Sequence, residues 1–505
     1  MAKSQDTAFF GHPAGLSTLF FTEMWERFSY YGLRANLILY MTAPAAIGGL
    51  AWGVEKAGPI LGTYAASAYL MSMPGGWVAD RVLGLRRSVF WGGVLIMCGQ
   101  ISLAMLNSAV FFFPGLILVA LGTGMLKPNV SALVGQLYGE KDARRDAGFS
   151  IYYMGINIGA TASPIICGWL AQGEGFQHLL IRWGIDPATS WHWGFGFGAF
   201  GMALGLLQYV LTGNRLGNAG LTVLGASTAE TLASGRRRFF LGIGGVLVLI
   251  AILAGLSRAG VITITPTGVS HAMDYVLVAV VVGFFAWLFM AGEWTPDERR
   301  RLIVIMVLFL GALIFWSAFE QAASTLNLFA ARQTRNTILG LSYPASWLQS
   351  VNAILIILLA PVAGWVWLKL GPRDPSSPAK FSMGLFFLGM GFAVMILAAM
   401  AASSGQKVSP LWLVLTYLCH TVGELCLSPV GLSAMTRLAP ARVTGLMMGV
   451  WFLASSVGNK IAGTVAGLYE SFTLPTIFGT VTAIALFFAL VMALLVRPIK
   501  RMMAR

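Results

Sequence analysis

Apolar segments of about twenty residues, long enough to cross a bilayer as helices, recur along the whole of this 505-residue chain. Strands of a membrane β-barrel are shorter and alternate in polarity. The sequence therefore predicts an all-α polytopic membrane protein. We expect fourteen transmembrane helices, near residues 14–41, 58–80, 88–107, 111–136, 146–171, 192–212, 238–257, 272–292, 302–329, 345–370, 381–402, 410–437, 442–468 and 474–497.

Charged residues are scarce and unevenly placed. They make up 10% of the chain, against roughly 25% in soluble globular proteins. If both termini are cytoplasmic, 23 of the 33 Lys and Arg residues fall in cytoplasmic segments and six on the opposite side, with the other four inside spans. Because cytoplasmic loops of membrane proteins are enriched in Lys and Arg, topology explains the net charge of +14 without nucleic-acid binding. We expect a multi-pass protein of the inner (plasma) membrane with both termini in the cytoplasm.

The motifs do not indicate catalysis or a metal site. The four cysteines lie in apolar segments, and none forms a metal-type pair; they are Cys98, Cys167, Cys419 and Cys426. No Walker-type Gly-Lys-Ser/Thr loop for ATP is present in the sequence. We therefore expect no enzyme activity, no metal and no cofactor. We expect the protein to contact the lipid bilayer and to need no obligate protein partner.

A trace of internal repetition indicates two halves. Gly76-Trp-Val-Ala-Asp80-Arg81 stands at the end of the second predicted span, and Gly364-Trp-Val-Trp-Leu-Lys369 stands at the end of the tenth. If each segment belongs to a six-helix half, the seventh and eighth spans form an insert. This pattern is that of a parallel-repeat transporter with its binding site at the midplane between the halves. We expect a six-helix bundle over 1–213, a linker and two-helix insert over 214–298, and a second six-helix bundle over 299–505.

Several ionisable residues interrupt the apolar spans. In the first span, Glu23, Glu26, Arg27 and Arg34 share one helical stripe with Tyr30. A charge at bilayer depth costs a few kcal/mol, so such residues usually face a polar cavity or a partner. The stripe therefore predicts a helix that lines a polar pathway.

The charges of the two halves are complementary. The first half supplies the cations Arg34 and Lys127, and the second supplies the carboxylates Glu320 and Glu424. A cavity between them would suit a zwitterion, and its carboxylates could carry protons because burial and neighbouring cations shift their pKa in opposite directions. The alternatives are a snorkelling lysine at position 127 and buried interhelical hydrogen bonds for any single polar residue.

These residues fall in motifs that resemble the proton-dependent oligopeptide transporter family of the major facilitator superfamily, in its bacterial form. The first-helix motif is Glu23-x-x-Glu26-Arg27-Phe-x-Tyr-Tyr31-Gly with Arg34. The other matching stretches are Gly76 to Gly84, Phe149 to Gly159, Phe315 to Gln321 and Gly423 to Leu432. Two features depart from the family pattern: Ala160-Thr161 replaces the usual Ser-Leu, and His420, to which we assign no role, precedes Glu424 by one turn.

The resemblance implies a major facilitator fold and a set of site residues. Proton coupling would rest on five residues: Glu23, Glu26, Arg27, Lys127 and Glu320. Lys127 would pair with the first-helix carboxylates, and Glu320 would exchange a salt bridge with Arg34. Arg34, Lys127 and Tyr31 would attract the peptide carboxylate, while Glu424 would hold its ammonium group. Hydrogen bonds to the peptide backbone and pockets for its side chains would come from Asn157, Asn352, Tyr30, Tyr69, Trp316, Ser428 and Trp451.

The implied function is a symporter that uses the proton gradient to import di- and tripeptides by alternating access. Another small anion or zwitterion carried on the same fold is an alternative substrate. A drug/proton antiporter would need a larger and less charged cavity. A transport-inactive sensor is a further alternative, although the longest non-membrane stretch, 213–237, holds no sizeable soluble domain.

Overall fold

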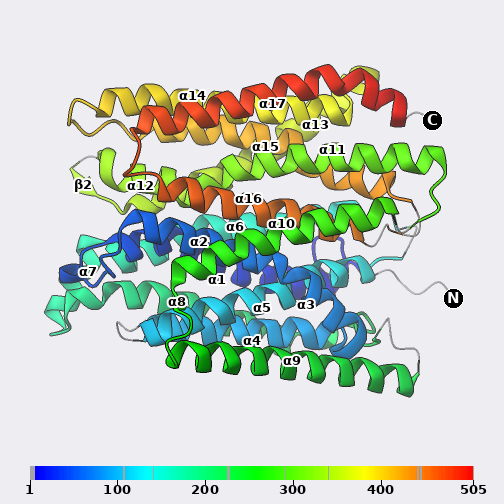
Figure 1. Cartoon of the computed structure of the whole chain (residues 1–505), viewed down its shortest axis with the longest axis horizontal. Helices are drawn as coiled ribbons and strands as arrows, with labels where there is room; N and C mark the ends of the chain where they lie inside the picture. Colours follow the sequence, from blue (N-terminus) through cyan, green and yellow to red (C-terminus); the bar gives the residue numbers. More distant parts are fainter. Residues whose placement is uncertain are drawn as a thin grey trace. The chain divides into compact units, whose positions relative to one another are not determined.

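The computed structural model describes residues 6–105, 109–139, 142–223, 228–290, 292–338, 340–440, 443 and 446–503. Four of the basic residues counted toward the topology, Lys3, Lys141, Arg442 and Arg505, lie outside these ranges. Within them the fold is almost entirely helical (Figure 1).

The helices follow the predicted order. Those of the first predicted half are α1 (Ala14–Thr42), α2 (Val54–Leu70), α3 (Ser72–Val78), α4 (Leu85–Ala104), α5 (Ala109–Gln136), α6 (Arg145–Gln172), α7 (Glu174–Arg182) and α8 (Ser190–Leu211). The predicted insert contains α9 (Ala229–Arg258) and α10 (Pro266–Met290). The second predicted half contains α11 (Pro296–Phe319), α12 (Thr325–Gln333), α13 (Ser350–Leu370), α14 (Ser377–Ala402), α15 (Leu411–Leu438), α16 (Met447–Gly467) and α17 (Leu474–Met503).

Eleven helices of the described ranges are long and apolar enough to cross a membrane. The other three predicted spans correspond to α1, to α2 with α3, and to α16. Charged residues reduce the apolar character of α1, and α2 is only 17 residues long. Together they account for the fourteen spans and confirm a polytopic helical membrane protein.

Two predicted spans are broken rather than continuous. The second span divides at Met71 into α2 and α3 and continues as a π-helical turn, Ala79–Leu83, which ends at Gly84. Gly84 has φ +81°, a conformation that glycine adopts without steric cost. The ninth span ends its α-helix at Phe319, passes through a 3₁₀ turn at Glu320–Ala323 and resumes as α12. Such breaks are tolerated in membranes where the surrounding protein covers the backbone.

The chain packs into two compact units. Unit 1 comprises Met1–Tyr30, Leu70–Gly159 and Phe195–Ala272. In it α4 packs against α5, and α9 approaches the π-helical turn, where a Cβ on Gly235 would lie 2.5 Å from the Arg81 carbonyl oxygen. The most apolar stretch of α9 buries none of its residues, as expected for a helix that faces lipid.

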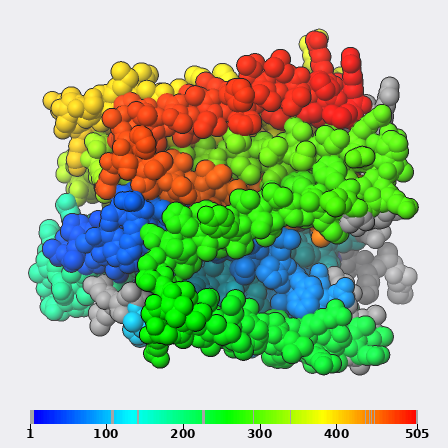
Figure 2. Space-filling view, in the orientation of Figure 1, coloured from blue at the N-terminus to red at the C-terminus, as the bar shows by residue number. Residues whose placement is uncertain are grey.

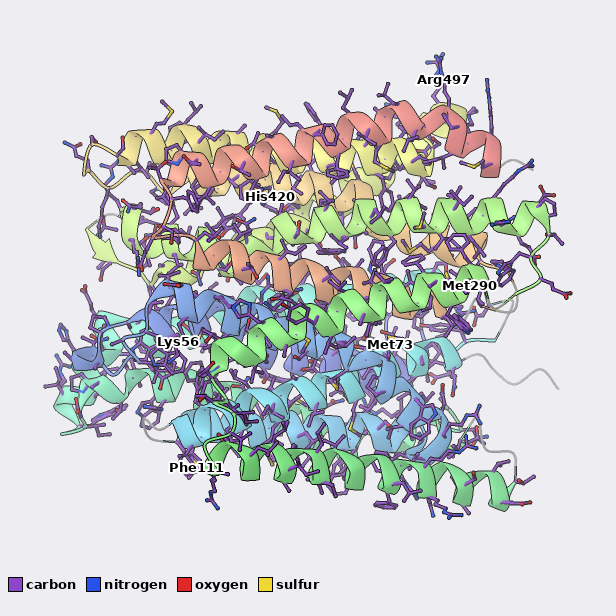
Figure 3. The ribbon with its side chains drawn as sticks, in the orientation of Figure 1. Lys56, Met73, Phe111, Met290, His420 and Arg497 are labelled. Carbon is purple, nitrogen blue, oxygen red and sulfur yellow. The ribbon has the colours of Figure 1, made fainter. Side chains whose placement is uncertain are left out.

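Unit 2 comprises Tyr31–Tyr69, Ala160–Gly194 and Met273–Arg505. In it α14 packs against α15 and α17, and α11 packs against α16. Fully buried phenylalanines fill its interior, among them Phe309, Phe315, Phe381 and Phe392. Figure 3 shows Arg497 pointing away from the helices and His420 among them.

A short antiparallel hairpin marks one end of unit 2. Strand β1 (Thr337–Ile338) pairs with β2 (Leu341–Ser342). Near it, Arg332 on α12 forms an ion pair of 2.7 Å with Glu470, just after α16. We call this the hairpin end; it includes α12, the start of α2 and the end of α16, where a Cβ on Gly467 would contact Pro59.

Candidate functional site

The first charged cluster lies on α1 within unit 1. Arg27 Nε is 3.2 Å from Glu23 Oε1 and also pairs with Glu26. All three side chains are at most 3% exposed. Their spacing follows from the helix, because positions 23 and 27 are one turn apart and share a face. Two carboxylates facing one guanidinium leave an excess negative charge unless one of them is protonated or another cation compensates it.

Residues from other helices surround this cluster. The Tyr30 ring lies 4.9 Å from the Arg27 guanidinium carbon. Tyr152 on α6 lies beside Glu23, and Lys127 on α5 acts on Glu23 electrostatically. The structure thus brings Lys127 into the field of the first-helix carboxylates.

The second charged cluster lies in unit 2, further along α1. Arg34 Nη2 pairs with the Glu320 carboxylate and lies 3.5 Å from the Glu320 carbonyl oxygen. The side chains are 9% and 3% exposed. The break after Phe319 presents both the carboxylate and the carbonyl of Glu320 to Arg34. The Tyr31 ring lies 6.0 Å from the Arg34 guanidinium carbon.

A carboxylate on α15 belongs to the same site. Asn352 Nδ2 on α13 donates to Glu424 Oε2 at 3.2 Å and to Thr421 Oγ1 at 2.9 Å. Arg34 and Glu320 both act electrostatically on Glu424. Unit 2 therefore places one cation and two carboxylates within electrostatic reach of one another.

The remaining predicted residues divide between the two units. In unit 2 the Trp316 and Trp451 rings lie 6.3 Å apart and nearly perpendicular, and the Tyr69 ring lies 6.3 Å from Phe452. Ser428 is half-buried one turn after Glu424. Asn157 belongs to unit 1, where its Nδ2 donates to the Tyr153 carbonyl of its own helix at 2.9 Å.

A small cavity adjoins the Arg34–Glu320 pair. Its lining includes residues that the sequence analysis did not single out. They come from α2, the α11–α12 break and α16: Leu61, Gly62, Ala65, Ala323, Ser324, Asn459, Ala462 and Gly463. Asn459 could have been identified from the sequence, because it is a polar residue next to Lys460 within an apolar segment.

Glycines bring α2 and α16 into close contact at this cavity. A Cβ on Gly463 would lie 2.5 Å from the Gly58 carbonyl oxygen, and one on Gly62 would lie 3.0 Å from the Lys460 carbonyl oxygen. Ser456 Oγ also donates to the Ala66 carbonyl at 2.7 Å. We call the contact of Gly58 and Gly62 with Gly463 the glycine gate. It extends from the cavity lining, at Gly62 and Gly463, toward the hairpin end, where α2 begins and α16 ends.

His420 lies one turn before Glu424 on α15 and is 1% exposed. Its ring centroid lies 4.9 Å from that of Phe392 and 6.2 Å from that of Phe319. Nothing in its contacts assigns His420 to the site.

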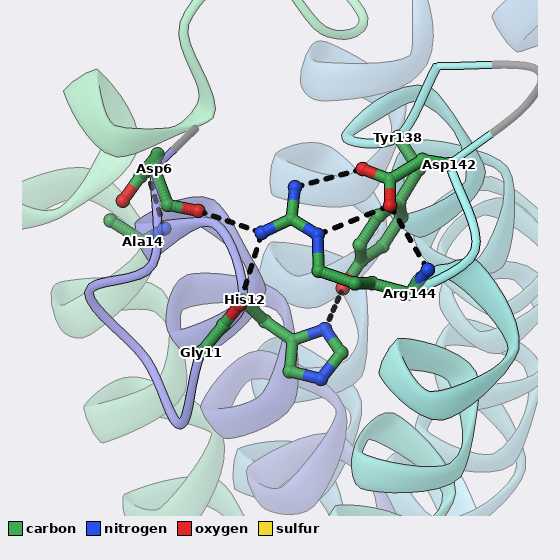
Figure 4. A network of polar contacts seen from close by, with 7 residues as sticks. All are labelled: Asp6, Gly11, His12, Ala14, Tyr138, Asp142 and Arg144. Carbon is green, nitrogen blue, oxygen red and sulfur yellow. Dashed lines mark hydrogen bonds and ion pairs between the residues drawn. The ribbon is translucent and has the colours of Figure 1, made fainter. Parts of the chain in front are cut away.

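A polar network in unit 1 anchors the chain before α1 (Figure 4). Arg144 Nη1 donates to the carbonyl oxygens of Asp6 and Gly11, and Arg144 Nη2 pairs with Asp142 Oδ2 at 2.8 Å. His12 Nδ1 lies 2.9 Å from the Tyr138 hydroxyl. Hydrogen bonds from Arg144 hold the pKa of Asp142 below its usual range, and burial raises the pKa of Tyr138 to about 12. The network ties the N-terminal segment to the loop between α5 and α6.

Comparison with known proteins gives consistent matches over the chain. A sequence model of the POT family matches residues 86–484. A peptide transporter of Yersinia enterocolitica is 42% identical, with 98% of this chain and 96% of that protein covered. A crystal structure of a POT peptide transporter in complex with sulfate has a TM-score of 0.90 and 40% identity, covering 99% of this chain and 98% of that one. A POT transporter crystallised with 5-aminolevulinic acid has a TM-score of 0.88 and 33% identity, with 98% of each chain covered.

Proposed function

The chain belongs to the POT family, and we propose that it is a proton-coupled symporter that imports di- and tripeptides by alternating access. The observation that carries the proposal is the charge arrangement of unit 2. Arg34 is paired with Glu320, and Glu424 stands beside Asn352 within their electrostatic reach. Peptides are zwitterions, so a buried site that offers both signs of charge matches both of their ends.

The peptide carboxylate would bind Arg34 in place of Glu320, aided by Tyr31 and Lys127. Its ammonium group would bind Glu424, which Asn352 already holds by a hydrogen bond. The exchange would keep Arg34 neutralised, and protonation of Glu320 would neutralise the carboxylate that loses its partner, because an unpaired buried charge is costly. Trp316, Trp451, Tyr69 and Ser428 would contact the peptide side chains, and Asn157 the peptide backbone.

The proton would act at the first-helix cluster. Protonation of Glu26 or Glu23 would weaken the ion pairs with Arg27 and the attraction between Lys127 and these carboxylates. Lys127 could then attract the peptide carboxylate. An inward proton crossing a potential of about 100 mV supplies roughly 2.3 kcal/mol. Helix α1 carries this cluster and Arg34 on one continuous helix, which offers a mechanical route between protonation and binding.

Topology follows from the distribution of basic residues. We place the termini in the cytoplasm and the hairpin end outside, in the inner membrane. The glycine gate then closes the outer side of the site. Transport would proceed by rocking of two bundles, 1–213 and 299–505, around the loaded site, with 214–298 as an insert.

A second candidate substrate is a small zwitterion that is not a peptide. One structural neighbour was crystallised with 5-aminolevulinic acid, which favours this candidate. The charges of unit 2 also match a carboxylate and an ammonium group, and they do not require a peptide bond between the two. Competition separates the two candidates: an excess of unlabelled dipeptide should suppress uptake of a labelled dipeptide more strongly than an equal concentration of 5-aminolevulinic acid does.

The proposal is tested by uptake of a labelled dipeptide into liposomes that contain the purified protein. With an imposed inward proton gradient, we expect accumulation above the external concentration, and without it only equilibration. Uptake that ignores the gradient would rule out symport, and absence of any dipeptide uptake or competition would rule out the peptide substrate.

A further inference from the structure

An ion pair joins the insert to the helix that forms the glycine gate. Asp274 Oδ1 on α10 lies 2.8 Å from Lys460 Nζ on α16, and both residues belong to unit 2. The Lys460 side chain is 4% exposed and that of Asp274 is 42% exposed. The sequence motifs assign no role to Lys460 or to the insert.

The pair lies inside both helices, about two turns from the start of α10 and about two turns from the end of α16. Asp274 is eight positions after Pro266, where α10 begins, and Lys460 is seven positions before Gly467, where α16 ends. At 1.5 Å per residue, these distances are about 12 Å and about 10 Å along the helix axes. A lysine within a membrane helix is unfavourable unless it faces a polar cavity or a partner of opposite charge. Asp274 therefore neutralises the buried ammonium group of Lys460.

Lys460 is also part of the gate through its backbone. Its carbonyl oxygen lies 3.0 Å from the position of a Cβ on Gly62 of α2. Asn459 and Gly463, which flank Lys460 on α16, line the cavity beside Arg34 and Glu320. A displacement of Lys460 would thus change the spacing of α2 and α16 at the gate.

Helix α10 is held at a second point. Phe285 on α10 stacks edge-on against Phe309 of α11 at a centroid distance of 5.1 Å. Leu288 on the same helix is 1% exposed. Figure 2 shows α10 on the near face of the molecule, in green. The ion pair and the aromatic contact tie this one helix to both α16 and α11.

We propose that Asp274 and Lys460 are positioning residues that hold the glycine gate closed, so that the insert sets the balance between the closed and open states of the gate. Asp274 keeps the Lys460 side chain at its depth in the protein. Without this carboxylate, Lys460 would move toward water at the hairpin end and draw α16 away from α2. The inference rests on the proposed alternating access.

The test measures opening of the gate directly. Ala65, which lines the cavity from α2 and is 3% exposed, is replaced by cysteine after the four native cysteines are changed to alanine. The reagent is a membrane-impermeant methanethiosulfonate, added outside proteoliposomes without peptide or proton gradient. Each variant is first checked for a monodisperse size-exclusion profile.

Asp274→Asn is expected to raise the labelling rate about three- to fifteenfold, the range that corresponds to losing a polar contact between membrane helices. Lys460→Met should raise it as well, because this variant also removes the ion pair that ties α16 to α10. Asp274→Glu keeps the charge and should label like the parent. The exchanged pair Asp274→Lys with Lys460→Asp should label more slowly than either single variant.

The matched control is Glu470→Gln, which removes the carboxylate of the exposed pair with Arg332 at the same end and should leave labelling unchanged. Parent-like labelling of both Asp274→Asn and Lys460→Met would overturn the inference. The inference would also be overturned if Glu470→Gln were labelled as fast as Asp274→Asn. Because the assay needs no transported substrate, a protein that fails to move peptides yet labels as expected would refute the proposed function and not the role of this pair.

Discussion

The guanidinium of Arg34 pairs with the carboxylate of Glu320, although 286 positions separate them in the sequence. The pair is buried and adjoins a cavity that Gly62 and Gly463 of the glycine gate also line. In the proposed transport cycle, the peptide carboxylate would take the place of Glu320 beside Arg34.

Replacing Arg34 by lysine should weaken peptide binding. Lysine keeps the charge but lacks the planar fork that binds a carboxylate through two hydrogen bonds. We expect the KM for dipeptide uptake to rise about tenfold, since a charged hydrogen bond contributes roughly 1.5–3 kcal/mol. Arg332→Lys, in an exposed ion pair, is the matched control, and an unchanged KM for Arg34→Lys would argue against its role as the carboxylate anchor.

Replacing Glu424 by glutamine should affect only peptides with a free ammonium group. The variant keeps a carbonyl oxygen for the Asn352 hydrogen bond but loses the negative charge. Inhibition constants for an unmodified dipeptide and its N-acetylated form are compared in the parent and the variant. We expect the unmodified peptide to lose about tenfold in affinity and the acetylated form to change little; an equal loss for both would point to a structural role.

Glu26→Gln should separate binding from coupling. The Glu26 carboxylate pairs with Arg27 in a cluster that is almost fully buried, and glutamine cannot take up or release a proton there. We expect gradient-driven accumulation to be lost, while exchange of labelled for unlabelled dipeptide continues. Accumulation at the parent level would show that the proton is carried elsewhere.

Gly463→Ala should disturb the glycine gate. The added Cβ would lie 2.5 Å from the Gly58 carbonyl oxygen, so α2 and α16 must separate. Overpacking of this kind typically costs about 1–3 kcal/mol. We expect a lower thermal midpoint and faster outside labelling of a cysteine at position 65. Gly364→Ala on α13, where a Cβ meets nothing within 4 Å, should leave both measurements unchanged.

The network around Arg144 should make stability depend on acid pH. Hydrogen bonds from Arg144 lower the pKa of Asp142 in the folded state, so folding favours its ionised form. Its stabilising contribution is therefore present above the unfolded pKa of about 3.9 and is lost as the pH falls through the lower folded value.

Thermal midpoints of the parent and Asp142→Asn, measured between about pH 3 and pH 7, should differ most at neutral pH and converge in acid. The difference should be small, because the pair is partly exposed and screened by water. A constant difference over the whole range would show that Asp142 does not act through its charge.

The sequence predicted the membrane spans well because hydrophobicity is a local property. It also predicted that Glu23 and Arg27 lie on one helical face, which the structure confirms as an ion pair. The break after Phe319 was not predicted, because the stretch 315–329 contains no glycine or proline that would mark a helix end. A hydrogen bond from Gln349 to the Ala322 carbonyl helps to hold the turn that carries Glu320.

Partners across helices were less accessible to sequence reasoning. Lys460 and Asp274 lie far apart in the sequence, and no local pattern indicates that an ion pair joins α10 to α16. The glycine gate has the same origin: Gly58, Gly62 and Gly463 are three among 60 glycines, and only the packing shows which ones meet. The roles assigned to the site residues remain predictions.

Proton movement with the peptide tests the central proposal most directly. Liposomes containing the protein and an internal pH dye are held without any ion gradient, with potassium and valinomycin to clamp the potential at zero, and a dipeptide is added outside. We predict acidification of the lumen in the parent protein, saturating with dipeptide concentration, and none in Glu26→Gln. Entry of labelled dipeptide into the parent liposomes without acidification would contradict proton-coupled symport.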